Sequence, residues 1–180
     1  ISGPKAFVYT VNAGYIPEDH WIKDPLLGGG RVIGEAVHFI DLLRFIIEAP
    51  ISSLKINSMI QSKINSDNFI ITLKFRDNSI ATINYFSNGS KSYPKEKLEV
   101  FSSGKVIVLN NFKKLNSWGN NKFKINNIFE QNKGHLECVS TFMNRISHDF
   151  YFENDYESYI EVHSLIFNSL KKWGDVAFLA

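Results

Sequence analysis

The segment 31–47 places the strongest constraint on the fold. Apolar residues recur there with a period of about 3.6 residues, which predicts a helix. They form two adjacent tracks: Val32, Ala36, Phe39, Leu43 and Ile47, and beside them Ile33, Val37, Ile40 and Ile46. So wide an apolar surface indicates a helix that is buried against a sheet. Pro50 closes the segment, because proline cannot continue a helix.

The rest of the sequence supplies strands for such a sheet. One β-branched and aromatic run, AFVYTV at 6–11, precedes the helix, and alternating runs follow it. These later strands are expected at 53–60, 68–76, 79–86, 97–101 and 106–109, with hairpin turns at Asp77-Asn78 and Ser103-Gly104. Short turns between neighbouring strands favour antiparallel pairing. The polar, asparagine-rich segment 113–127 is expected to be an extended edge or a loop.

Two more helices are expected at the end of the chain, over 135–146 and 155–173. Asn154 is the expected N-cap of the second, with Glu157 three residues later as an imperfect capping box. The predicted fold class is therefore α+β, a predominantly antiparallel open-faced sheet with helices packed on one face. At 180 residues, we expect 1–180 to be a single domain.

The first residues suggest that this domain belongs to a longer protein. Ile1-Ser2-Gly3-Pro4 lacks an initiator methionine and resembles an interdomain linker running directly into a strand. There is no signal-peptide pattern and no apolar stretch of bilayer length, so no membrane partner is expected. The net charge of +2 gives no nucleic-acid footprint. The single cysteine, Cys138, suits a reducing cytoplasm, and its apolar neighbours predict a buried, inert thiol.

Polar residues that could carry chemistry concentrate around the start of the 31–47 helix. On an α-helix, Arg31, Glu35 and His38 share one stripe, because they are spaced four and three residues apart. One interpretation is a salt-bridged seam with a hydrogen-bonded core histidine. The other is a polar binding site under the long loop 12–30, since loops of this length are often functional. Spacing alone does not choose between these two interpretations.

Neither a metal site nor a nucleotide motif is predicted. Glu35-x-x-His38 has the form found in di-iron bundles, but such bundles need two of these motifs. His20, Glu35 and His38 lack the closely spaced ligand pair typical of zinc sites. The glycine run 28–30 precedes a helix but lacks the lysine and Ser/Thr of a P-loop, and it does not directly follow a strand.

The run GGGRVIGEAVHFID at 28–41 resembles the GGG-x-x-x-D-x-G-x-H-x-x-D signature of the glucose–fructose oxidoreductase and inositol dehydrogenase family. The strand meander and the segments VNAGYIPEDHW, SYPKEKLEVF and KGHLECVSTFMNRI are also similar, so the resemblance covers nearly the whole chain. It implies the C-terminal, substrate-binding domain of an NAD(P)-dependent oxidoreductase acting on a sugar, sugar nucleotide or cyclitol. It also implies a homodimer or tetramer formed through the open sheet face.

The resemblance assigns roles to individual residues. The signature histidine falls on His38, the expected proton donor or acceptor at the substrate, a role that suits an imidazole. Asp41, Gly29 and Gly30 are expected to be structural or orienting. The expected substrate contacts are Arg31, Glu35, Asn12, Tyr15, His20 and Trp21. NAD or NADP and the family's catalytic lysine belong to the Rossmann domain, which this sequence lacks, so no tight cofactor binding by this chain is expected.

The sequence departs from the signature at the position of its first aspartate. The family's aspartate four residues before the histidine is replaced by Gly34. Glu35 could supply the carboxylate, although its side chain points about 100° further round an α-helix. Two other functions stay open: a non-catalytic dimerisation or ligand-binding domain of the same fold, and an unrelated α+β binding module. Trp21 either stacks on a sugar ring or anchors its loop in the core, and His135 is expected to be only a helix-start residue.

Overall fold

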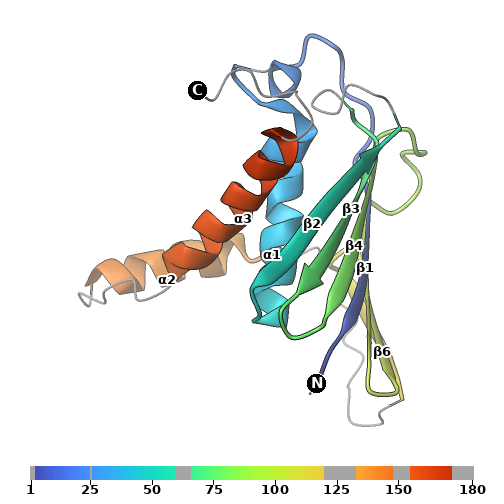
Figure 1. Cartoon of the computed structure of the whole chain (residues 1–180), viewed down its shortest axis with the longest axis vertical. Coiled ribbons are helices and arrows are strands. Elements are labelled where there is room, and N and C mark those ends of the chain that lie inside the picture. The colour runs from blue at the N-terminus through green and yellow to red at the C-terminus, as the bar shows by residue number, and fades with distance from the viewer. Residues whose placement is uncertain (1–2, 25, 60–65, 120–132, 148–154, 172–180) are drawn as a thin grey trace.

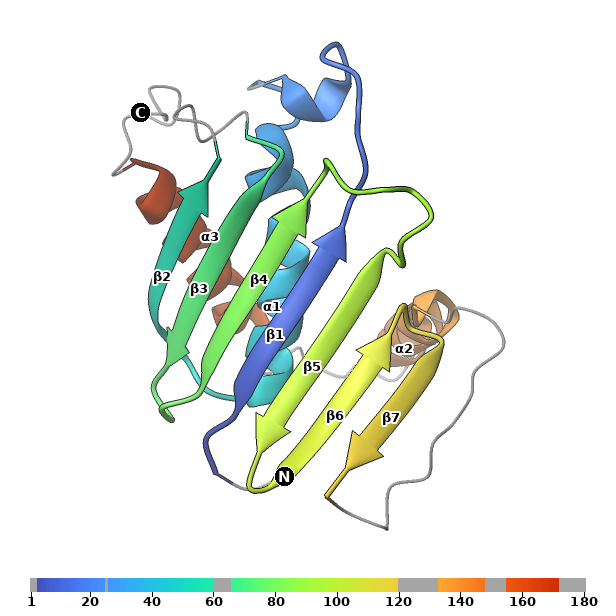
Figure 2. The same ribbon diagram turned by 90° about the vertical axis from the view of Figure 1, so that its right-hand side faces the viewer.

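The computed structural model describes residues 3–24, 26–59, 66–119, 133–147 and 155–171. The strands in these ranges form one sheet in the order β2-β3-β4-β1-β5-β6-β7 (Figure 2). Their bounds are β1 Ala6–Asn12, β2 Ile51–Ser58, β3 Phe69–Phe75, β4 Ile80–Phe86, β5 Glu96–Ser102, β6 Lys105–Asn110 and β7 Lys114–Trp118. The polar segment 113–127 therefore contains an edge strand in its described part.

The helices begin and end close to their expected positions, with one local difference. Their bounds are a short 3-10 helix Trp21–Lys23, a π-helical turn Val32–Ala36, α1 Val37–Ile47, α2 His135–Ser147 and α3 Asp155–Lys171. The predicted helix over 31–47 thus opens with a π turn before it becomes α-helical. Asn154 and Trp173 lie outside the described residues. None of the helices in the described ranges combines the length and the apolar character that crossing a bilayer requires.

Strand β1 occupies the middle of the sheet. It pairs with β5 in antiparallel fashion and with β4 in parallel fashion, while the other strand pairs are antiparallel. Because β1 and β4 run in the same direction, their carboxyl ends meet at one edge, where Val11 lies opposite Tyr85 on β4 and Glu96 on β5. The long loop 12–30 leaves the sheet at this edge.

One face of the sheet is covered by α1 and α3, and the other face is open (Figure 1). Alternate strand residues such as Tyr9 and Ile83 point into the layer between sheet and helices and are buried. Helix α1 buries Ile40, Leu43 and Ile47 there, and α3 adds a stripe of its own, Val162, Ile166 and Leu170. The predicted α+β class, with a mostly antiparallel open-faced sheet, is confirmed.

Helix α2 does not join this core. It lies on the helical side of the sheet but projects away from it (Figure 1), and none of its side chains is buried. Cys138 is exposed, so the expectation of a buried thiol is wrong. The apolar periodicity correctly identifies a helix with an apolar face. It cannot say what that face contacts, and in the described part of the chain the apolar side chains of α2 are exposed.

We expect Ile40→Ala to lower the free energy of unfolding by about 2–5 kcal/mol, because Ile40 is fully buried and its removal leaves a cavity. Phe45→Ala, on the exposed side of the same helix, should change it by about 0.5 kcal/mol or less. Urea unfolding followed by far-ultraviolet circular dichroism measures both. Equal losses from the two substitutions would contradict the orientation of α1 described here.

Candidate functional site

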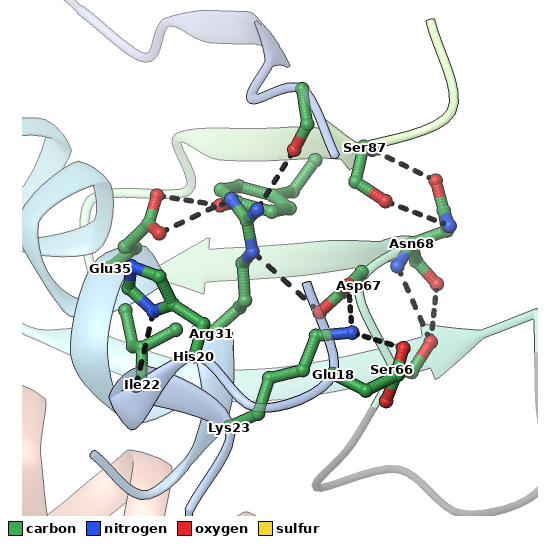
Figure 3. Close-up of polar contacts among 12 residues, drawn as sticks. Glu18, His20, Ile22, Lys23, Arg31, Glu35, Ser66, Asp67, Asn68 and Ser87 are labelled. Atoms are coloured by element: carbon green, nitrogen blue, oxygen red, sulfur yellow. Dashed lines mark hydrogen bonds and ion pairs between the residues drawn. The ribbon is translucent and has the colours of Figure 1, made fainter. Parts of the chain in front are cut away.

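A buried arginine joins the start of the helix to the end of the sheet. The side chain of Arg31 is only 2% exposed, and its contacts appear in Figure 3. Its Nη1 donates to the Tyr85 hydroxyl (2.5 Å) and to Glu35 Oε1 (3.2 Å), and its Nη2 donates to the Gly14 carbonyl (2.8 Å). The Asp67 carboxylate lies 3.6 Å from Nε. Arg31 therefore connects the π turn, β4, the end of β1 and the segment before β3.

Tyr85 completes this cluster from the sheet. Its hydroxyl accepts from Arg31 and donates to Glu35 Oε2 at 2.6 Å. Burial raises the pKa of Tyr85 above its ordinary value and the hydrogen bond to Glu35 raises it further, while Arg31 partly opposes both. The hydroxyl therefore stays protonated at neutral pH and keeps its donor role. In the sequence Tyr85 is simply one inward residue of an alternating strand, so no pattern identified it as part of a site.

A second cation holds the long loop against the sheet. Lys23 Nζ lies 3.0 Å from Asp67 and 2.6 Å from Glu18, so Asp67 faces both Lys23 and Arg31 (Figure 3). Lys23 ends the 3-10 helix of loop 12–30, and Asp67 precedes β3. Asp67 was not among the expected site residues, because it stands in a polar, turn-like segment whose neighbours in space the sequence does not reveal.

The glycine run serves the turn that leads into the helix. Gly29 and Gly30 have φ angles of 67° and 78°, in the left-handed region that favours glycine. A Cβ on Gly28 would lie 2.3 Å from the Ile22 Cα. The amides of Gly28 and Gly29 both donate to the Asp24 carbonyl at 2.9 Å. Two amides of the glycine run are therefore already used inside the turn.

At the position of the signature aspartate, a side chain would require Ile22 to shift. A Cβ on Gly34 would lie 2.9 Å from Ile22 Cδ1, and Ile22 is buried. The nearby carboxylate is that of Glu35, which both Arg31 and Tyr85 hold. Gly34 and Glu35 both lie in the π turn, a local structure that is frequent at functional sites. The carboxylate present in this turn is therefore that of Glu35, one residue after the position of the signature aspartate.

His38 lies apart from the Arg31 cluster. It is exposed on α1, and no hydrogen bond or ion pair between described residues joins it to Arg31 or Glu35. The expected three-residue stripe therefore splits after Glu35. The prediction of one stripe assumed α-helical spacing throughout, whereas residues in the π turn are joined by i→i+5 hydrogen bonds.

His38 instead lines a groove of about 540 Å³ between α1 and α3. The groove residues are His38, Asp41, Leu42, Arg44, Phe45, Glu48, Ser158 and Tyr159. Burial raises the pKa of Asp41, and the positive charges of His163, His38 and Arg44 oppose that rise. Arg44 is also paired with Glu161 at 3.0 Å. The groove thus combines an imidazole, carboxylates, hydroxyl groups and aromatic rings.

Asn12 holds a neighbouring loop. Its Nδ2 donates to the carbonyls of Ser90 (2.8 Å) and Tyr93 (3.3 Å). A Cβ on Gly89 would lie 2.2 Å from Asn12 Oδ1, so this loop passes close to the side chain. In this structure the Asn12 amide therefore connects the end of β1 to the β4–β5 connection.

The remaining loop residues lie at the surface. His20 caps the 3-10 helix, with its Nδ1 accepting from the Ile22 amide at 3.3 Å. Trp21 is 60% exposed and Tyr15 is also exposed. Of the two interpretations of Trp21, an anchor in the core of this chain is therefore wrong. Among the described residues, no group of three or more His, Cys, Asp or Glu side chains could hold a metal ion.

Residues 4–108 match the family described as the GFO/IDH/MocA C-terminal domain. A search of curated protein sequences gives no match. Solved structures with the same fold include the UDP-N-acetylglucosamine 3-dehydrogenase of Acidithiobacillus ferrooxidans, with a TM-score of 0.66 and 12% identity. They also include the aldose-aldose oxidoreductase of Caulobacter crescentus complexed with glycerol (TM-score 0.71, 11% identity). A third is the WlbA dehydrogenase of Bordetella pertussis in complex with NADH and UDP-GlcNAcA (TM-score 0.61, 15% identity).

The likeness extends over nearly all of this chain and over only part of those proteins. The matches cover 99%, 94% and 93% of this chain, respectively. They cover 55%, 54% and 52% of the solved chains. This chain therefore spans about half the length of the proteins it matches, and at these identities the likeness establishes the fold.

We expect Arg31→Met to lower the free energy of unfolding by about 3–5 kcal/mol, because it leaves the partly buried Glu35 carboxylate without its cation and the Gly14 carbonyl without its donor. Lys97→Met removes a more exposed ion pair with Glu99 and should cost about 0–1 kcal/mol. Chemical denaturation of both variants provides the comparison. A loss for Arg31→Met as small as that for Lys97→Met would mean that the cluster does not stabilise the fold.

Proposed function

Since this chain belongs to the GFO/IDH/MocA family as a C-terminal domain, we propose that it forms the substrate side of an NAD(P)-dependent oxidoreductase. The substrate class is a sugar, sugar nucleotide or cyclitol. Support comes from the three solved proteins of the same fold, whose names describe enzymes or complexes of such compounds. The single observation that carries the proposal is the place of His38, which stands at the histidine position of the signature and lines an open groove.

His38 is the proposed proton donor or acceptor at the reacting hydroxyl or carbonyl of the substrate. An imidazole can move a proton in either direction near neutral pH, and this one is accessible from solvent. Asp41 is one helical turn away and half-buried, and its charge interacts with that of His38. Asp41 is therefore proposed to orient the imidazole, which agrees with the orienting role implied by the signature.

The groove beside His38 is suited to a polyol. The carboxylates of Asp41 and Glu48 can accept hydrogen bonds from sugar hydroxyl groups, and the Tyr159 ring offers an apolar face. Arg31 and Glu35 lie on the other side of the helix start. Their ion pair and the hydrogen bond from Arg31 to the Gly14 carbonyl hold the loop that carries Tyr15. Asn12, His20 and the exposed rings of Tyr15 and Trp21 stay predicted substrate contacts.

The proposal assigns NAD or NADP to a part of the protein outside this chain. The Gly28 and Gly29 amides are committed to Asp24, so the glycine run offers no phosphate cradle. The residues of this chain would bind and orient the substrate, and His38 would move its proton. We also propose a cytoplasmic location, which the single exposed thiol of Cys138 suits.

We expect His38→Ala, in the complete protein, to lower kcat/KM for cofactor-dependent oxidation or reduction of the sugar substrate by about 10²–10⁴-fold, the usual contribution of a general acid or base. His135→Ala is the matched control, because His135 is an exposed residue at the start of α2 and should leave turnover unchanged. Steady-state rates of NAD(P)H formation or consumption report both. Unchanged turnover in His38→Ala would contradict the role of His38, whereas a wild-type protein without any cofactor-dependent turnover would favour the non-catalytic alternative, for which the Gly34 departure is the specific observation.

A second part of the proposal concerns assembly through the open sheet face. An apolar row crosses five strands there, because the register aligns its members side by side. The row is Ile80, Ala6, Phe101, Val106 and Trp118. Its three large members, Ile80, Phe101 and Trp118, are 43–55% exposed. A contiguous exposed apolar row of this kind is typical of a protein interface, and a two-fold dimer would cover it with its own copy.

We expect Phe101→Lys to shift the protein towards monomer, because it places a charge in the middle of this row. Tyr93→Lys, at an exposed loop position outside the row, should leave the oligomeric state unchanged. Sedimentation velocity over a range of protein concentrations measures the change. A wild-type protein that stays monomeric at the highest concentration would contradict the assembly proposal.

A further inference from the structure

Ile22 is buried although it belongs to the long loop 12–30. It is the middle residue of the 3-10 helix Trp21–Lys23, and its exposed fraction is only 6%. It lies outside the core of buried residues between the sheet and the helices. Its burial therefore comes from a separate contact, which joins this loop to the turn that leads into α1.

Two glycines leave the space that the Ile22 side chain occupies. A Cβ on Gly34 would lie 2.9 Å from both Cγ1 and Cδ1 of Ile22, and a Cβ on Gly28 would overlap the Ile22 backbone. The same Cβ on Gly34 would also lie 3.3 Å from the Gly28 carbonyl oxygen. Because glycine has no Cβ, these two positions form a slot for Ile22, which we call the glycine slot.

The wall of the glycine slot at Gly34 is held in place. Gly34 lies in the π turn, between Arg31 and Glu35. The Tyr85 hydroxyl contacts both of these side chains, at 2.5 Å from Arg31 Nη1 and at 2.6 Å from Glu35 Oε2. A side chain at position 34 would therefore displace Ile22, and with it the 3-10 helix, from the π turn.

The contact of Ile22 sets the direction of its neighbours. A 3-10 helix has three residues per turn, so adjacent side chains point about 120° apart. With Ile22 directed inward, Trp21 is directed outward and is 60% exposed. The His20 ring lies 5.9 Å from the Trp21 ring, and its Nδ1 accepts from the Ile22 amide (Figure 3). Lys23 holds the end of the same helix through Asp67 at 3.0 Å.

We propose that Ile22 and Gly34 are positioning residues for substrate binding. Through the glycine slot they fix the 3-10 helix, so that His20 and Trp21 present their rings in one direction. The indole of Trp21 offers a large apolar face to the C–H groups of a sugar or cyclitol ring. This inference rests on the proposed function, in which both rings contact the substrate. It also explains the departure at position 34, since an aspartate there would occupy the space of Ile22.

The test compares Gly34→Ala with the double variant Ile22→Ala/Gly34→Ala in the complete protein. We expect Gly34→Ala to raise the substrate Kd about tenfold, because its methyl group displaces Ile22 and moves both rings. In the double variant the shortened side chain leaves room for that methyl group, so the Kd should return to within about threefold of the wild-type value. The kcat should change less than about twofold in both variants, since His38 lies in a different contact region.

The Kd is measured by isothermal titration with three probes, one for each proposed substrate class. They are UDP-N-acetylglucosamine, glucose and myo-inositol. The kcat is measured as NAD(P)H formation with the probe that binds. Circular dichroism at the assay temperature establishes that each variant is folded.

Two single variants separate positioning from stability. Trp21→Ala removes an exposed ring, so it should leave the fold intact and raise the Kd roughly three- to tenfold. Ile47→Ala is the matched control for Ile22→Ala, because it truncates a buried isoleucine at the far end of α1. It should lower the stability and leave the Kd unchanged.

Three results would overturn the positioning proposal. In the first, Trp21→Ala binds the probe as tightly as the wild-type protein. In the second, adding Ile22→Ala to Gly34→Ala raises the Kd further in place of restoring it. In the third, Gly34→Ala lowers kcat and leaves the Kd unchanged, which would place its effect on proton transfer. A wild-type protein that binds none of the three probes would instead contradict the proposed function, and the positioning proposal with it.

Discussion

The buried guanidinium of Arg31 is the interaction on which the organisation of this domain depends. It brings together the π turn, the end of β1, β4 and the segment before β3, which are distant in sequence. Removing a charge from water is costly, and here two carboxylates, a hydroxyl group and a backbone carbonyl compensate it. The long loop 12–30 therefore has a defined course although it is mostly irregular, and the start of α1 is held against the sheet.

The sheet separates two surfaces of different character. Its helical side carries the core, the His38 groove and the exposed stripe of α2, whereas its open side carries the apolar row centred on Phe101. A sheet with one covered face leaves the other face available for assembly. The proposed substrate binding on one side would then leave the opposite side free for the proposed subunit contacts.

The departure from the family signature has a local physical explanation. Ile22 fills the space beside Gly34, and the carboxylate of Glu35 is bound by Arg31 and Tyr85. Glu35 thus contacts Arg31 and Tyr85, whereas a side chain at position 34 would contact Ile22. A carboxylate held by two donors is suited to positioning the loop. The proposed proton transfer falls to His38, which lies in the groove between α1 and α3.

The sequence by itself determined the elements of this protein. Periodicity and turn residues predicted the buried helix, the hairpins and the two last helices, because these signals are local. Only the tertiary structure decided that β1 inserts beside β4 in parallel, that Tyr85 and Asp67 meet Arg31, and that the described part of the chain leaves the apolar side chains of α2 exposed. These are contacts between distant segments. A periodic pattern reports that a face is apolar or a residue is charged, and the partner of that face or charge is chosen by packing in three dimensions.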